Sequence, residues 1–278
     1  MSRRAPPLPL GRHDPRQARF LTGGSLRWIV RNRAWTPYHL RRYVRFALLK
    51  LRHPDVVTEG LVFLGKGVRL EARPGYGRIV LGRFVHIGDG NALRAHEGTL
   101  RLGDKVVMGR DNQVNAHLDI EIGAGTIVSD WVYVCDFDHV TSDLTTPIKD
   151  QGIVKSPVRI GPGSWIGTKV SVLRGTVVGR GSVLAAHAVV RGRFPDYSIV
   201  GGVPARLLRR RDDNKPTVGS TVDTAVDSTV DTAVGSAAGS APDRARLVAD
   251  GRAHEVATVQ EAVRLATVPS GRREQVER

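Results

Sequence analysis

Large aliphatic residues recur at every sixth position over much of this chain. Read from Ile160, they are Ile160, Ile166, Val172, Val178, Leu184 and Val190. An α-helix would give a period of about 3.6 and a lone strand a period of two, so neither element explains the spacing. A sustained period of six is typical of a parallel β-helix, in which each short strand turns a corner and stacks on the coil below. The hexads therefore predict an all-β solenoid whose core consists of aliphatic columns.

The pattern continues, with insertions, from residue 61 to residue 210. Earlier hexads are Leu81, Ile87 and Leu93, then Leu102, Met108 and Val114, then Ile122, Val128 and Val134. Three hexads make one coil, one for each side of a triangular prism. The positions four places after the aliphatic residue are small or β-branched, as at Ser164, Thr176 and Ser182. Glycine often comes directly after the aliphatic residue, where we expect a corner whose backbone conformation disfavours a Cβ atom.

Composition agrees with such a fold. Of the 278 residues, 31 are glycine, 41% are hydrophobic and only 5% are aromatic, which suits short aliphatic rungs and tight corners. The single cysteine, Cys135, excludes an internal disulfide and fits a reducing compartment. No apolar run is long enough to span a bilayer, and the Arg-rich N-terminus lacks the apolar stretch of a signal peptide. The sequence therefore predicts a cytoplasmic protein.

The net charge of +15 is concentrated before the hexads, in an N-terminal extension of residues 1–60. Residues 1–53 hold 13 Lys and Arg against the single acid Asp14, which gives +12. Residues 36–53 predict a helix, because Thr36 can cap it and Pro37 suits its first position. Its apolar residues are Leu40, Tyr43, Val44, Ala47, Leu48 and Leu51. Two interpretations stay open. The helix contacts the inner face of an anionic membrane, or the apolar face of the helix packs against the main domain.

The C-terminal residues 211–278 differ in character from the hexads. The run STVDTAVDSTVDTAVGSAAGSAP is repetitive, small and polar, and it has too little bulk to bury a core, so we expect a disordered tail. Neither end carries a helix-turn-helix, a zinc finger or an aromatic RNA-binding motif. The positive charge alone therefore does not lead us to expect nucleic acid as a partner.

The largest interruption of the hexads follows Val134, where residues 135–159 replace the regular repeats. A segment of that length must bulge from the wall of the prism, and such loops in compact folds are commonly functional. It begins with Cys135, Asp136, Phe137, Asp138 and His139. An imidazole titrates near neutral pH, and a neighbouring carboxylate can orient it and stabilise its charged form. His139 is therefore a candidate general base, with Asp136 or Asp138 as its partner.

Four motifs in succession resemble the hexapeptide-repeat acyltransferases, in particular the maltose, galactoside and polysaccharide O-acetyltransferases. They are DFDHVTSDLTTPI, PVRIGPGSWIG, VLRGTVVGRGSVLAAHAVV and FPDYSIVGGVPARLLRR, and the resemblance covers about residues 60–210. It implies a left-handed parallel β-helix, a homotrimer, acetyl-CoA bound between adjacent subunits, and one catalytic histidine per site.

Carried over position by position, the resemblance assigns roles to individual residues. It implies His139 as the catalytic histidine and places Asn115 and Trp165 near the acceptor. It lines the CoA slot with Thr168, Ala186 and Arg206. Further arginines suited to the phosphates of CoA are Arg191, Arg193, Arg209, Arg210 and Arg211. One departure from the family pattern is the added bulk of residues 184–188, Leu-Ala-Ala-His-Ala, for which we expect either a narrower slot or a different hold on the pantetheine of CoA.

These observations predict an acyl-CoA-dependent O-acyltransferase that acetylates a sugar hydroxyl, and the basic helix points to a lipid-linked glycan or glycolipid as acceptor. One alternative is N-acetylation of an amino sugar. Another is a non-catalytic membrane-associated scaffold, which an intact His139 and Trp165 disfavour. Transfer through Cys135 is disfavoured because a small residue at a corner suffices to explain it. No metal is expected, because the histidines of the hexad region show no close ligand pair.

Overall fold

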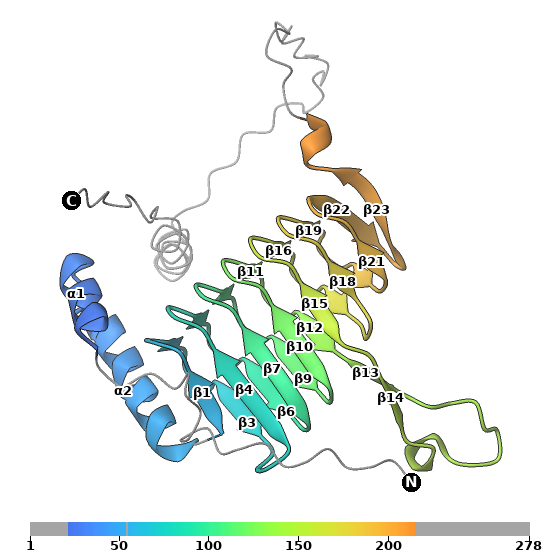
Figure 1. Ribbon diagram of the computed structural model, residues 1–278, viewed down its shortest axis with the longest axis horizontal. Helices are drawn as coiled ribbons and strands as arrows, with labels where there is room; N and C mark the ends of the chain where they lie inside the picture. The colour runs from blue at the N-terminus through green and yellow to red at the C-terminus, as the bar shows by residue number, and fades with distance from the viewer. Residues whose placement is uncertain (1–21, 54, 215–278) are drawn as a thin grey trace, which may run out of the picture.

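The computed structural model describes residues 22–53 and 55–214, and in this part of the chain two helices precede a parallel β-helix (Figure 1). The predicted all-β solenoid with a basic helical N-terminal segment is confirmed. The tail predicted to be disordered lies outside the described residues, apart from residues 211–214. None of the helices within the described ranges is long and apolar enough to cross a membrane.

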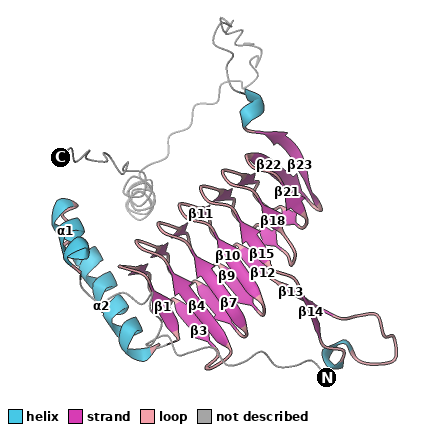
Figure 2. Ribbon diagram, in the orientation of Figure 1, coloured by secondary structure: helices cyan, strands magenta, loops and turns pink. Residues whose placement is uncertain are grey.

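Three sheets form the sides of the prism (Figure 2). The first sheet contains β1 (Val56–Thr58), β4 (Gly77–Leu81), β7 (Gly98–Leu102), β10 (Asp119–Ile122), β15 (Val158–Ile160), β18 (Val177–Val178) and β21 (Arg193–Phe194). The second sheet contains β2 (Phe63–Leu64), β5 (His86–Ile87), β8 (Val107–Met108), β11 (Ile127–Val128), β16 (Trp165–Ile166), β19 (Val183–Leu184), β22 (Ser198–Gly202) and β23 (Ala205–Arg210). The third sheet contains β3 (Arg69–Ala72), β6 (Ala92–Ala95), β9 (Gln113–Ala116), β12 (Tyr133–Cys135), β17 (Ser171–Val172) and β20 (Val189–Val190).

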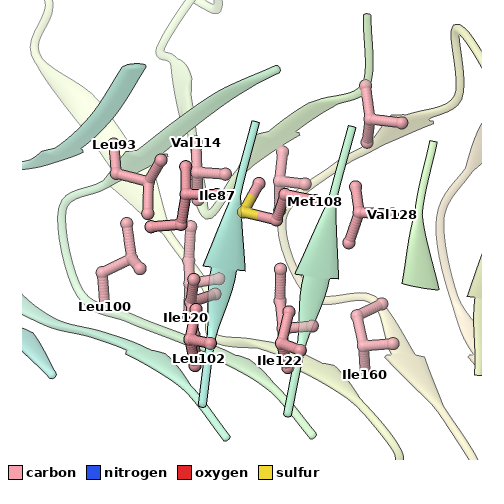
Figure 3. Packing of buried hydrophobic residues seen from close by; sticks show 14 of the residues in the cluster. Ile87, Leu93, Leu100, Leu102, Met108, Val114, Ile120, Ile122, Val128 and Ile160 are labelled. Carbon is pink, nitrogen blue, oxygen red and sulfur yellow. The ribbon is translucent and has the colours of Figure 1, made fainter. Parts of the chain in front are cut away.

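Each strand of these sheets pairs in parallel with the equivalent strand of the next coil, so hexad positions lie above one another. In the second sheet the register joins Ile87 to Met108, Met108 to Val128, and Val128 to Ile166. These side chains are almost fully buried and form one of the predicted aliphatic columns. Figure 3 shows Ile87, Met108 and Val128 of this column. The exception to parallel pairing at the C-terminal end is β22–β23, an antiparallel pair at the edge of the second sheet.

The small residues four places after each aliphatic position fill the inner corners. Ser164, Thr176 and Ser182 are buried, and each hydroxyl donates to a backbone carbonyl three residues earlier, at 2.8, 2.6 and 2.9 Å. A larger side chain would meet the aliphatic columns, and a small apolar one would remove a hydrogen bond from that carbonyl. The small residues four places after the aliphatic positions are therefore explained by the limited space at the inner corners.

The glycine after the aliphatic residue has a different cause from the one we expected. Gly161 and Gly179 do not have positive φ; instead, a Cβ atom on Gly161 would lie 2.4 Å from the backbone nitrogen of Arg180 in the next coil. The left-handed conformation occurs two residues later, as at Gly163 and at Lys169 (φ 57°). Coil stacking, and not corner conformation, therefore excludes a side chain at these regularly spaced glycines.

Two helices cover the N-terminal end of the prism: α1 (Gly23–Arg31) and α2 (Pro37–Arg52). The predicted start of α2 is confirmed, because the side chain of Thr36 caps it and Pro37 is its first residue. The sequence did not predict α1, whose N-terminal cap is Thr22. Phe46 and Leu49 of α2 are buried in the core that continues into the β-helix.

Aromatic and basic side chains join the helices to the first coil. Phe63 of β2 lies 5.3 Å from Trp28 and stacks at 4.2 Å on His86. Burial, followed by the charges of Arg42 and His39, lowers the pKa of His86 to about 3. Arg42 also donates to the carbonyl of Phe63 at the outer edge of the second sheet. The helices thus cover a strand edge that would otherwise offer free carbonyl groups.

Candidate active site

The interruption of the hexads forms a projecting loop, as predicted. After β12 the chain leaves the prism as β13 (Phe137–His139), turns through a short 3-10 helix, η2 (Ile148–Asp150), and returns as β14 (Ile153–Lys155) (Figure 1). The two strands are antiparallel, and His139 pairs with Ile153. The loop is therefore an ordered ribbon that fixes the backbone of His139 at a corner between the third and first sheets.

Asp136 anchors the root of this ribbon. Its carboxylate is fully buried and accepts hydrogen bonds from the backbone N–H groups of His117, Leu118 and Asp119 at 2.7, 2.8 and 2.7 Å. Three charge-assisted hydrogen bonds occupy the carboxylate. Asp136 therefore holds the loop to the preceding coil, and it is not the partner of the His139 ring.

The side chain of His139 is exposed at the end of β13. Its ring lies 6.3 Å from that of Phe137, in an edge-on arrangement. Within residues 22–53 and 55–214, no side chain hydrogen-bonds to the imidazole, so both ring nitrogens are open to a substrate.

Asp138 points to a different partner. Its carboxylate accepts a hydrogen bond from Nε of Arg174 at 2.5 Å, across the gap to the next coil. Neighbouring residues of a strand point to opposite faces, so Asp138 and His139 diverge. The ion pair ties the ribbon to the prism, and a role for Asp138 as the partner of His139 stays a prediction.

Three rings form a column at the root of the ribbon, the first two stacked and the third edge-on. His96, His117 and Phe137 follow β6, β9 and β12 at equivalent points of successive coils, with ring centroids 4.6 and 4.3 Å apart. Burial, and then the charges of His96 and Lys155, lower the pKa of His117, and its Nδ1 is buried with no partner in the described part of the chain. The column packs against the edge of Phe137 at the root of the ribbon. Sequence reasoning missed it, although the spacing of 20 or 21 residues is visible.

Asn115 and Tyr133 border the same corner. Asn115 pairs with Cys135 across the β9–β12 register, and its side chain interacts with the hydroxyl of Tyr133, whose pKa burial raises to about 12. Burial also raises the pKa of the Cys135 thiol, which disfavours the thiolate that a nucleophile requires. The predicted substrate residue Asn115 thus lies one coil from the strand that leads to His139, whereas Cys135 is a packing residue.

The remaining predicted residues lie around a different corner of the prism. Trp165 is exposed on the second sheet, and its indole N–H donates to the hydroxyl of Ser129 at 3.1 Å. Thr168 follows it at the corner to the third sheet and accepts a backbone hydrogen bond from His187 of the next coil. Ala186 precedes His187, and Arg206 is exposed on β23.

The structure therefore separates the predicted site into two groups. Asn115, Asp138 and His139 gather where the third sheet meets the first, whereas Trp165 and the CoA-slot residues flank the corner between the second and third sheets. Within one chain these groups do not form a common pocket. No cluster of three or more His, Cys, Asp or Glu side chains in the described ranges is arranged to hold a metal.

Comparisons with known proteins agree with this architecture. The model of the bacterial transferase hexapeptide, six repeats, matches residues 157–192. "Probable acetyltransferase Rv3034c" of Mycobacterium tuberculosis is 61% identical over 198 residues, which cover 71% of this chain and 66% of that protein. The chain belongs to the hexapeptide-repeat acetyltransferase family.

Two further similar proteins have a lower sequence identity to this chain. A protein of Escherichia coli named "Putative lipopolysaccharide biosynthesis O-acetyl transferase WbbJ" is 33% identical over 122 residues, covering 39% of this chain and 62% of that protein. The chain thus spans somewhat less than two thirds of the length of these relatives. A mutant of AntD, an N-acyltransferase from Bacillus cereus solved with dTDP and coenzyme A, has a TM-score of 0.51 at 21% identity and covers 60% of this chain and 89% of its own. That likeness shows the fold.

The family match covers only part of the predicted site. Residues 157–192 include Trp165, Thr168 and Ala186, whereas His139 lies before them in the projecting loop. The repeat itself is structural, so membership in the acetyltransferase family supports the roles of these residues without testing any of them.

Proposed function

We propose that this protein is an acetyl-CoA-dependent O-acetyltransferase that acylates a hydroxyl group of a sugar, with His139 as the general base. The observation that carries the proposal is the position of His139, exposed and with both ring nitrogens open, at the end of a ribbon that Asp136 and Arg174 fasten to the prism. The names of the relatives from M. tuberculosis and E. coli support acetyl transfer, and the second of them supports a sugar acceptor.

The reaction requires one proton acceptor at the acceptor hydroxyl. A ring nitrogen of His139 removes the hydroxyl proton as the oxygen attacks the carbonyl carbon of the thioester. A C–O bond forms, the C–S bond breaks, and the protonated imidazole returns its proton to the departing thiolate, so free CoA and the ester leave. A histidine without an internal hydrogen bond can make both transfers, because no protein group competes for the nitrogen that faces the substrate.

The two groups of site residues support a homotrimer with a site shared between copies. The corner with His139 and the corner with Trp165 and Thr168 lie on different sides of one prism. If adjacent copies bring unlike corners together, His139 of one copy faces the slot of another, where Arg206 and its basic neighbours bind the phosphates of CoA.

Subunit mixing tests this arrangement. His139→Ala and Trp165→Ala proteins are mixed, partly denatured and reassembled, and activity is assayed at a low acceptor concentration, at which we expect little turnover by either variant alone. Shared sites predict that activity returns, because some interfaces then carry an intact His139 opposite an intact Trp165. Activity that stays absent, although the mixed oligomers form, would show that both residues act within one copy.

The activity itself is tested with labelled acetyl-CoA. The purified protein is incubated with envelope glycans, beside His139→Ala and the matched variant His53→Ala, in which an exposed histidine at the end of α2 is removed. We expect alkali-labile label with the native protein and His53→Ala only. Alkali-stable label would instead establish N-acetylation of an amino sugar, and absence of label with a folded native protein would favour the scaffold.

A further inference from the structure

The helix α2 carries an apolar stripe that the rest of the described structure leaves open. Leu40, Val44, Leu48 and Leu51 are exposed by 60, 53, 39 and 72%. Their spacing of four, four and three residues places them along one side of the helix. These four residues are most of the apolar face that the sequence predicted, so the interpretation in which that face packs against the main domain is wrong. We call them the outer stripe.

The opposite side of α2 makes the contact with the β-helix. Its buried residues are His39, Arg42, Phe46 and Leu49. At about 100° per residue this buried side lies opposite the outer stripe. The helix α2 lies across the end of the β-helix (Figure 1) and packs on β2 through this buried side. The outer stripe, on the opposite side, therefore faces away from the prism. The helix is thus fixed by one face while a second apolar face is presented outward.

Basic side chains border the outer stripe. Residues 22–53 contain eight Lys and Arg and no Asp or Glu. Arg41, Arg45 and Arg52 follow one edge of the stripe, and no described acidic side chain pairs with Arg41 or Arg52. An apolar stripe beside unpaired guanidinium groups matches a surface that is anionic outside and apolar beneath. A second copy of the same helix would instead bring like charges together.

A cavity of about 230 Å³ opens beside this basic edge, between α2 and the first coil. Its polar lining includes Arg45, Arg52 and His53, and Gly65 and Gly67 of the first coil line it as well. Leu48 belongs both to the cavity and to the outer stripe. A lipid phosphate group placed there would contact the guanidinium groups of Arg45 and Arg52, and the acyl chains of the same lipid would lie along leucine side chains.

We propose that the outer stripe docks this protein on an anionic membrane surface, with its leucines among the acyl chains and a lipid phosphate in the cavity beside Arg45 and Arg52. The occupant is a phospholipid layer, because its acyl chains match the apolar outer stripe and its phosphate groups match the arginines beside the stripe. The inference goes beyond acetyl transfer and is independent of it, since vesicle binding is measured without any acceptor or acetyl-CoA.

Vesicle sedimentation tests the proposal with the full chain. One set of vesicles is pure phosphatidylcholine, and a second contains about one third phosphatidylglycerol. Wild-type protein should sediment with the second set, and binding should fall as salt rises. The triple variant Leu40→Ser, Val44→Ser and Leu51→Ser should bind at least about tenfold more weakly, because exposed residues are removed while the buried face of α2 is kept. Leu208→Ser, an exposed leucine at the opposite end of the prism, is the matched control and should bind as wild type.

A double variant tests the basic edge. The protein with both Arg41→Gln and Arg52→Gln should bind the anionic vesicles roughly tenfold or more weakly, and its weak binding to phosphatidylcholine vesicles should be unchanged. Equal binding of the triple variant and wild type would overturn the proposal, since the charge of residues 1–21 would then suffice. A change of oligomeric state in the triple variant, without vesicle binding by wild type, would show that a second copy covers the stripe and would overturn it as well.

Discussion

Substitution of Asp136 tests how the loop that carries His139 is held. Asp136→Ala removes a buried carboxylate and leaves three backbone N–H groups, of His117, Leu118 and Asp119, without their acceptor. A buried donor left unpaired costs about 1–3 kcal/mol, and water that enters the space of the lost side chain recovers part of this. We therefore expect a loss of about 3–5 kcal/mol in the free energy of unfolding, which corresponds to a fall in Tm of roughly 10 °C.

The measurement is thermal and urea unfolding of wild type, Asp136→Ala and Asp136→Asn at one protein concentration. The asparagine keeps one oxygen as an acceptor but turns an NH₂ group toward the remaining N–H donors, so its loss should be smaller than that of alanine and still measurable. Activity should fall in both variants, because the ribbon that carries His139 loses its anchor. A Tm of Asp136→Ala within about 2 °C of wild type would refute the reasoning, since the three hydrogen bonds would then contribute little.

Three further outcomes follow from contacts described above. The pKa of His86 is lowered in the folded state to about 3, so below about pH 6.5 the unfolded chain binds a proton that the folded chain does not. The free energy of unfolding should therefore fall by up to about 2 kcal/mol between pH 7 and pH 5. In urea unfolding at several pH values, His86→Phe should make this free energy less dependent on pH. A double-mutant cycle of Asp138→Asn and Arg174→Gln should give a coupling of about 1 kcal/mol in unfolding, because both side chains are partly exposed; additive effects would show that the ion pair is not formed. Trp165→Phe removes the hydrogen bond to Ser129 and should raise KM for the acceptor several-fold with kcat nearly constant; a loss confined to kcat would place Trp165 in the chemical step instead.

Periodicity predicted the fold well because burial in a β-helix depends on a single repeated position. The aliphatic positions at Ile160, Ile166 and Val172 are all buried within their strands, as the count of six requires. The same count could not explain the glycine at Gly161, because the atoms that exclude its Cβ belong to the next coil, 19 residues later at Arg180.

The helix and the site were harder to predict, for different reasons. The α2 sequence has apolar residues on two opposite sides, so a helical wheel does not show which side is buried. Arg42 lies on the buried side, where its guanidinium group donates to the carbonyl of Phe63, a contact that the α2 sequence alone cannot reveal. For Asp138, adjacency to His139 in sequence suggested a contact, but the loop forms a strand whose side chains alternate. The partner Arg174 lies 36 residues away, beyond any local pattern.

The position of the helices at one end of the prism has a geometric consequence for the acceptor. Successive coils lie about 4.8 Å apart, so the fourth coil, from which the loop with His139 projects, lies roughly 14 Å above the first. A helix about 10 Å thick separates the first coil from whatever the outer stripe contacts. On a membrane, His139 would act roughly 25 Å above the lipid surface, so sugars next to a lipid anchor would pass below it. The number of coils before the loop would then select which residue of a tethered glycan receives the acetyl group.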